Sequence, residues 1–82
     1  MQATVELSIY PLTNDYVSVV WQFIDNLKKY ENIELVSNGL STQVFGDYRE
    51  VMDIITQETE NIFEHNKAVL VMKVAKGILK LN

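Results

Sequence analysis

The sequence predicts one α+β domain in which strands and helices follow in the order β-α-β-β-α-β. Three observations carry this prediction. Residues 3–10 alternate between apolar and polar side chains, two later segments have apolar residues at helical spacing, and two strand-like runs lie between those segments. Because 82 residues suffice for one such domain and not for two, we treat residues 1–82 as a single domain.

The first half of the chain predicts a strand and then a helix. In Ala3–Tyr10 every second residue is apolar, and Pro11 ends the run. Thr13 and Asn14 carry side-chain oxygens that can cap the following helix, which we expect from about Asp15 to Tyr30. The apolar residues at helical spacing in that segment are Val17, Val20, Ile24 and Leu27.

The middle of the chain predicts a β-hairpin. Strand-like runs at Ile33–Ser37 and Leu40–Gly46 are separated by Asn38-Gly39, a dipeptide that tolerates the positive φ angles of a type I′ turn. Such a two-residue turn places six side chains on one face, which we expect to meet the helices. The expected pairs are Leu40 with Ser37, Thr42 with Leu35, and Val44 with Ile33.

The second half predicts a helix and a final strand. Asp47 resembles a helix N-cap, because an acid follows it three residues later, and the apolar spacing continues to about His65. Ala68–Ala75 is rich in Val, Leu and Met and predicts the fourth strand. Gly77 is a candidate bend before a short apolar tail, Ile78–Leu81.

This order of elements is the split βαβ arrangement. Right-handed crossovers place both helices on one face of a four-stranded antiparallel sheet with strand order 4-1-3-2, which is a ferredoxin-like sandwich. The opposite face mixes polar and apolar side chains. The last strand, at one edge of the sheet, is apolar on both faces and would be a pairing hazard if uncovered. We therefore expect a homo-oligomer, a dimer or a tetramer.

Composition excludes several classes of function. Seven basic against eleven acidic residues give a net charge of −4, which is unsuited to nucleic acid, and the charges interrupt any membrane span. With no cysteine and no signal-peptide pattern, we expect a soluble cytoplasmic protein without disulfides.

Catalytic and metal-binding patterns are also missing from the sequence. The lone histidine, His65, falls at a helix end, where we expect a structural role, and the three glycines are isolated. We expect no enzyme, cofactor or metal site, and we assign Trp21 to the core or an interface. The acids of the second helix are interpreted as a solvated face: Asp47, Glu50, Asp53, Glu58, Glu60 and Glu64.

Five polar residues are candidates for binding a ligand. The expected register puts the Thr42 hydroxyl on the helix side of the sheet, where it needs a partner, either the backbone or a ligand. Ser41 points to the other face, and Ser8 and Tyr10 on the neighbouring strand flank it, as solvent-facing residues or as ligand contacts. Asn38, in the turn, completes the set.

Three segments in the same order and spacing resemble the thiamine-binding protein family (YkoF-like): Ser8-Ile-Tyr-Pro-Leu12, Leu40-Ser-Thr-Gln-Val-Phe-Gly-Asp47 and Glu50-Val-Met52. The resemblance covers essentially the whole chain. It implies a ferredoxin-like fold, assembly into dimers and tetramers, and binding of thiamine or its hydroxymethylpyrimidine portion. Thr42, Gly46 and Asp47 match the family pattern, whereas Phe45 replaces the acid that usually precedes the glycine.

The implied ligand is chemically compatible with the candidate residues. An aminopyrimidine offers donors and acceptors that hydroxyl and amide side chains such as those of Ser41, Thr42 and Asn38 can satisfy. A cationic thiazolium would favour an acidic protein with an aromatic face such as Tyr10 or Phe45. Two alternatives remain: a structural or regulatory oligomer that binds a protein through its sheet face, and an enzyme with a substrate-assisted mechanism.

Overall fold

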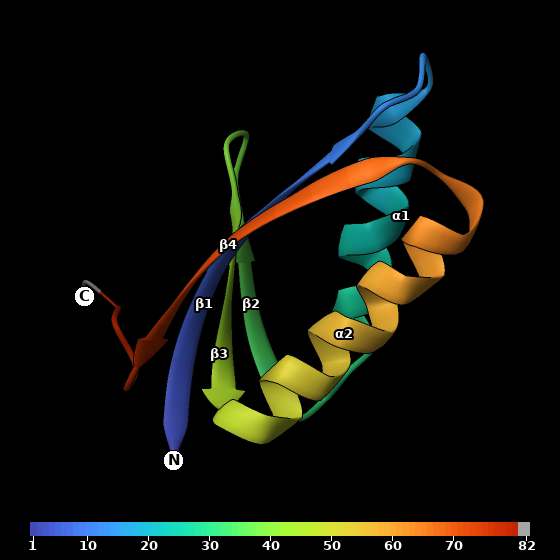
Figure 1. The fold of residues 1–82 in the computed structure, drawn as a ribbon. Helices are drawn as coiled ribbons and strands as arrows, with labels where there is room; N and C mark the ends of the chain where they lie inside the picture. Colours follow the sequence, from blue (N-terminus) through green and yellow to red (C-terminus); the bar gives the residue numbers. More distant parts are fainter. Residues whose placement is uncertain (81–82) are drawn as a thin grey trace.

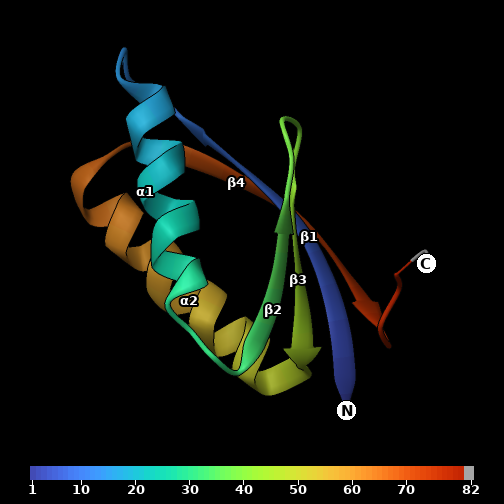
Figure 2. The same cartoon turned by 180° about the vertical axis from the view of Figure 1, so that it is seen from behind.

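The computed structural model describes residues 1–80 and confirms the expected order of elements and the expected topology. The sheet is antiparallel with strand order β2-β3-β1-β4, which is the predicted order 4-1-3-2, and both helices lie on one face of it (Figures 1 and 2). Leu81, predicted to end the apolar tail, lies outside the described residues. The elements are β1 (Gln2–Pro11), α1 (Tyr16–Lys28), β2 (Ile33–Ser37), β3 (Thr42–Asp47), α2 (Tyr48–His65) and β4 (Ala68–Lys76).

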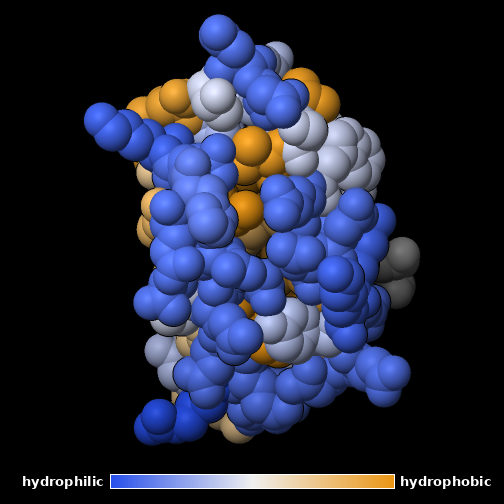
Figure 3. Space-filling view, turned by 90° about the vertical axis from the view of Figure 1, so that its right-hand side faces the viewer, coloured by the Kyte–Doolittle hydropathy of each residue, from blue (hydrophilic) through white to orange (hydrophobic). Residues whose placement is uncertain are grey.

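The hydrophobic core lies between the sheet and the two helices. The alternation of β1 turns Val5, Leu7 and Ile9 toward the helices, and each of these side chains is buried. Phe23 and Leu27 from α1 pack against this face, together with residues of α2 at helical spacing. The outer sides of the helices are largely hydrophilic (Figure 3).

The hairpin register differs from the expected one by two residues. Ser37 pairs with Thr42, and the connection is a four-residue loop, 38–41, closed by a backbone bond from Asn38 N–H to the Ser41 carbonyl (3.1 Å). Gly39 does not adopt the positive φ that a type I′ turn needs. Instead, the Asn38 side-chain oxygen accepts hydrogen bonds from the backbone N–H groups of Leu40 (2.8 Å) and Ser41 (3.1 Å).

The two-residue shift removes Leu40 from the sheet but leaves the faces of β2 and β3 unchanged. Leu40, predicted to face the helices, is 89% exposed in the loop. Because side chains alternate with a period of two, an even shift keeps Thr42 and Val44 on the helix side. The predicted buried face is therefore confirmed, although the predicted pairing of residues between β2 and β3 is wrong.

The two helices begin differently. Asp47 is the N-cap of α2, as predicted, and accepts a hydrogen bond from the Glu50 N–H (3.2 Å), which is the main cause of the lowered pKa of its carboxyl group. In α1 the N-cap is Asp15, not Thr13 or Asn14. The Asp15 carboxylate accepts from the Ser18 hydroxyl (2.6 Å), so no side chain caps the backbone there.

The C-terminal tail covers part of the outer face of the sheet. The chain bends at Gly77, whose φ is +90°, and the Thr4 hydroxyl donates to the Gly77 carbonyl and accepts from the Leu79 N–H (both 2.8 Å). Phe45, on this outer face, is only 3% exposed, and the Lys80 ammonium lies 4.8 Å from its ring centroid. The mixed outer face predicted from the sequence therefore includes a covered aromatic ring.

The acidic residues of α2 are not all solvated. Glu58 is only 6% exposed, which contradicts its assignment to a solvated face. The Tyr30 hydroxyl donates to its Oε2 (2.6 Å), and this hydrogen bond raises the pKa of the tyrosine; Oε1 has no partner among the described residues. Within residues 1–80, neither helix is long and apolar enough to cross a membrane.

Candidate ligand-binding site

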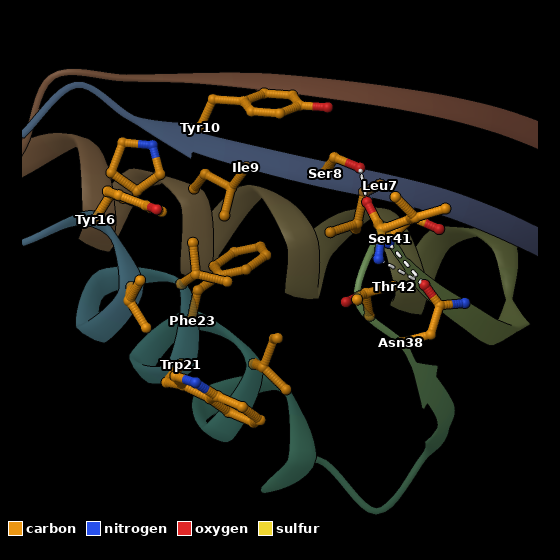
Figure 4. A pocket seen from close by; sticks show the side chains of 16 residues that line it. Leu7, Ser8, Ile9, Tyr10, Tyr16, Trp21, Phe23, Asn38, Ser41 and Thr42 are labelled. Carbon is orange, nitrogen blue, oxygen red and sulfur yellow. Dashed lines mark hydrogen bonds between the residues drawn. The ribbon is translucent and has the colours of Figure 1, made fainter.

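A pocket of about 330 Å³ lies between β1, α1 and the hairpin loop (Figure 4). It forms because β2 ends at Ser37 and β3 begins only at Thr42, whereas β1 continues to Pro11, so that α1 overhangs a part of β1 that has no strand on the hairpin side. All five sequence-predicted residues are part of its wall. The apolar part of the wall includes Leu7, Ile9, Val20, Phe23 and Ile24.

The hairpin loop is fastened to β1 by two serines. The Ser8 hydroxyl donates to the Leu40 carbonyl (3.1 Å), and the Ser41 hydroxyl donates to Oε2 of Glu6 (3.3 Å). Together with the Asn38 side chain inside the loop, these bonds fix the wall of the pocket at its polar end. The predicted proximity of Ser8 to Ser41 is thus present, with the Leu40 carbonyl between them.

Thr42 is buried at the base of the loop, with 4% of its surface exposed. Its Oγ1 lies 2.9 Å from the Ser37 Oγ, and either hydroxyl can be the donor. Among the described residues its partner is therefore a side chain and not the backbone. Two hydroxyl groups hold two hydrogens and their mutual bond uses one, so the accepting hydroxyl keeps a hydrogen for a third group.

Tyr10 lines the pocket differently from the other four residues. It pairs with Val69, it is 54% exposed, and its ring lies on the opposite side of β1 from Phe23 and Trp21 (Figure 4). Its ring therefore does not enter the interior of the pocket. The structure brings Asn38, Ser41 and Thr42 together, and Ser8 lies at the same end of the pocket.

The sequence interpretation missed the contribution of α1. Trp21, assigned to the core or an interface, is 56% exposed and lines the pocket, as do Tyr16 and Val17. Val17 and Trp21 are four residues apart and share a helix face. On α1 they extend the apolar stripe to the part of the helix that lies past the end of the hairpin. This signal could have identified α1 as a wall of the pocket.

The pocket wall carries no charged side chain in the described part of the chain. Its chemistry consists of hydroxyl and amide groups at one end and aliphatic and aromatic side chains at the other. Phe45, which replaces an acid in the family pattern, lies outside this wall, beneath the tail. Among residues 1–80, no three acidic or histidine side chains come together as metal ligands do.

Solved structures share this fold. Protein SP2199 from Streptococcus pneumoniae superposes with a TM-score of 0.87 at 24% identity, over 96% of this chain and 90% of the other. A candidate thiamine biosynthesis/salvage protein from Thermotoga maritima gives 0.84 at 18% identity, over 94% and 85%. Hypothetical protein MJ1052 from Methanocaldococcus jannascii gives 0.80 at 23% identity, over 99% and 86%. At these identities the likeness shows the fold alone.

Sequence comparison identifies the family. No curated protein matches the chain. Residues 2–77, which include all six helices and strands that the structure describes, match the pattern of the YKOF-related family. The match includes the β1 edge, the hairpin loop and the α1 face that together form the pocket. The chain therefore belongs to the YKOF-related family.

Proposed function

We propose that this protein binds thiamine or its hydroxymethylpyrimidine portion in the cytoplasm without catalysing a reaction. The pocket between β1, α1 and loop 38–41 carries the proposal, because it combines uncharged hydrogen-bonding groups with an apolar wall. Family membership supports it, and so does the thiamine-related name of the Thermotoga maritima protein.

The dimensions of the pocket favour the pyrimidine half of the vitamin as the buried portion. Its volume of about 330 Å³ is at the lower end of the range of about 300–1,000 Å³ that ligand pockets span. A single substituted ring suits that space better than two linked rings do. The uncharged wall also favours a neutral pyrimidine over a cationic thiazolium. Phe45 cannot offer its face to the cation, because Lys80 lies over the ring.

We expect hydroxymethylpyrimidine and thiamine to raise the melting temperature. At a ligand concentration of one hundred times Kd, binding to the native state adds about 2.7 kcal/mol, which in a domain of this size is a shift of roughly 10 °C or more. Differential scanning fluorimetry measures the shift, with the isolated thiazole portion as the control. If neither compound nor its phosphate ester shifts the melting temperature, the small-ligand function is wrong.

We also propose that the chain assembles into a dimer or tetramer through β4. This edge strand exposes about half of each of its valines, with 48% of Val69, 52% of Val71 and 46% of Val74 accessible. Its outer edge also has no neighbouring strand within the described chain, so that its backbone can pair with a second copy.

Light scattering at micromolar concentration should therefore give a mass of two or four times 9.5 kDa. Val71→Lys places a charge on the exposed outer face of this edge and should shift the population toward monomer. Glu60→Lys, on the exposed side of α2, is a matched control that should leave the mass unchanged. A mass of 9.5 kDa for the parent protein at every concentration would contradict the assembly.

The alternative is a structural or regulatory oligomer that binds a protein through its sheet face. One observation favours it: the outer face exposes apolar side chains at Tyr10, Val36, Val69 and Val71. This function predicts no response to any pyrimidine, so the melting experiment separates the two.

A further inference from the structure

The exposed hairpin loop contains Asn38-Gly39, the one asparagine–glycine pair of the sequence. Asparagine is chemically labile, because the nitrogen of the following peptide bond can attack its side-chain amide carbon. A glycine in the following position leaves that nitrogen unshielded, since glycine has no Cβ. Every other asparagine inside the chain is followed by a residue with a side chain, as Asn32 is by Ile33. The loop therefore holds the pair best suited to this reaction.

The Asn38 side chain is held in a turn that contains both reacting atoms. Its Oδ1 accepts hydrogen bonds from the backbone N–H groups of Leu40 (2.8 Å) and Ser41 (3.1 Å) (Figure 4). The ring that the Leu40 bond closes runs through Cγ of Asn38 and the nitrogen of Gly39, so the attacking atom and its target are gathered before the reaction. The two N–H groups also point at the oxygen on which negative charge develops during the attack.

The remaining groups that react are free of hydrogen bonds within the described chain. Among residues 1–80, neither the backbone N–H of Gly39 nor Nδ2 of Asn38 donates to a protein group. The attack on Cγ and the departure of Nδ2 therefore break no hydrogen bond of the protein. A methyl group at Gly39 would meet no atom within 4 Å, so water has access to the loop.

We propose that Asn38 deamidates spontaneously in the folded protein and thereby converts the uncharged wall of the pocket into an anionic one. The Gly39 nitrogen bonds to Cγ of Asn38, the bond from Cγ to Nδ2 breaks, and ammonia leaves with the proton of the Gly39 N–H. Water then opens the resulting succinimide at either carbonyl carbon, which gives aspartate or isoaspartate at position 38. Nothing is oxidised or reduced.

The two products affect the loop differently. Aspartate keeps an oxygen that accepts from the N–H groups of Leu40 and Ser41, and its charge strengthens these bonds. Isoaspartate passes the main chain through Cβ and Cγ, so the loop gains one backbone atom close to Leu40, whose carbonyl accepts from Ser8. Either product adds a negative charge to a wall that has no charged side chain in the described part of the chain. The reaction involves no ligand, so its test is independent of the proposed function.

Peptide mass spectrometry of the parent protein, incubated for days at mildly alkaline pH, tests the site. The peptide that contains Asn38 should gain about 1 Da as the amide becomes an acid, and the gain should divide between aspartate and isoaspartate. Asn32, exposed but followed by the β-branched Ile33, is the matched control in the same molecule and should keep its amide. An unchanged amide at Asn38, or equal conversion of Asn32, would overturn the proposal.

Two comparisons test the contribution of the loop. Gly39→Ala shields the nitrogen with a methyl group that meets no neighbouring atom, so this variant should melt like the parent protein but convert about tenfold more slowly. The parent chain unfolded in guanidinium chloride loses the turn and should also convert more slowly than the folded protein. Faster conversion of the unfolded chain would show that the loop protects Asn38 and would overturn the proposal, as would a folded Gly39→Ala variant that converts at the parent rate. If Gly39→Ala does not fold, the Asn32 control and the unfolded chain still decide.

Discussion

Truncation of Leu27 to alanine should lower the free energy of unfolding by about 2–5 kcal/mol. The Leu27 side chain is fully buried in α1 against the sheet. Removing most of its apolar side chain loses the transfer free energy of those atoms and leaves a cavity that close packing cannot refill. Urea unfolding of the ligand-free protein measures the loss as a lower midpoint with an unchanged slope.

Leu40→Ala is the matched control for Leu27→Ala. Because Leu40 is 89% exposed, its truncation should change stability by no more than about 0.5 kcal/mol. The two-residue turn expected from the sequence would bury Leu40 against the helices and make both truncations costly. If Leu27→Ala does not fold, Ile55→Val, at a position 2% exposed, should cost about 0.5–1.5 kcal/mol and provides the same comparison. Equal losses at Leu27 and Leu40 would contradict the register of the hairpin.

Thr42→Val should weaken ligand binding at least about fivefold while the fold survives. Valine keeps the volume and the β-branching that a strand favours, but it cannot hydrogen-bond to a ligand. An unmade buried hydrogen bond costs about 1–3 kcal/mol, which corresponds to a loss of this size in affinity. Calorimetry with hydroxymethylpyrimidine and thiamine measures the change.

Two further variants separate a ligand contact from a structural contact at this position. Thr42→Ser keeps the hydroxyl and should restore most of the affinity. Ser37→Ala removes the protein partner 2.9 Å away and leaves the Thr42 hydroxyl free for the ligand, so binding should persist. If Thr42→Val binds as tightly as the parent protein and only melts earlier, the hydroxyl stabilises the hairpin and does not orient a ligand.

The elements of the fold were predictable because local signals and burial agree. The alternation of β1 and the capping pattern at Asp47 describe what those residues do in the structure, and Gly77 has the positive φ expected of a bend. The hairpin loop was not predictable from Asn38-Gly39. The Asn38 side-chain oxygen satisfies two backbone N–H groups of the loop, so a wider connection competes with the tight turn.

Tertiary contacts also decided which polar residues are buried. The sequence interpretation assigned Glu58 to the solvated side of α2. In the structure this side chain is buried, and its carboxylate accepts a hydrogen bond from the hydroxyl of Tyr30, twenty-eight positions earlier in the chain. Four of the five candidate site residues lie at one end of a single pocket because β1 and the hairpin are neighbours in the sheet. The open edge of β1 beyond Leu7 could not be foreseen, because it depends on how far β3 extends beside β1.

The even displacement of the hairpin register constrains how the loop can change in length. If the four-residue connection keeps its geometry, inserting or deleting one residue beside it shifts the pairing of β2 with β3 by one. Such a shift turns every following β3 side chain to the opposite face and takes the Thr42 hydroxyl out of the pocket. A change of two residues keeps that hydroxyl and the buried Val44 in place and alters only the mouth of the pocket. Relatives that keep this connection should therefore differ at the hairpin by pairs of residues, and such pairs are a route to larger or smaller ligands.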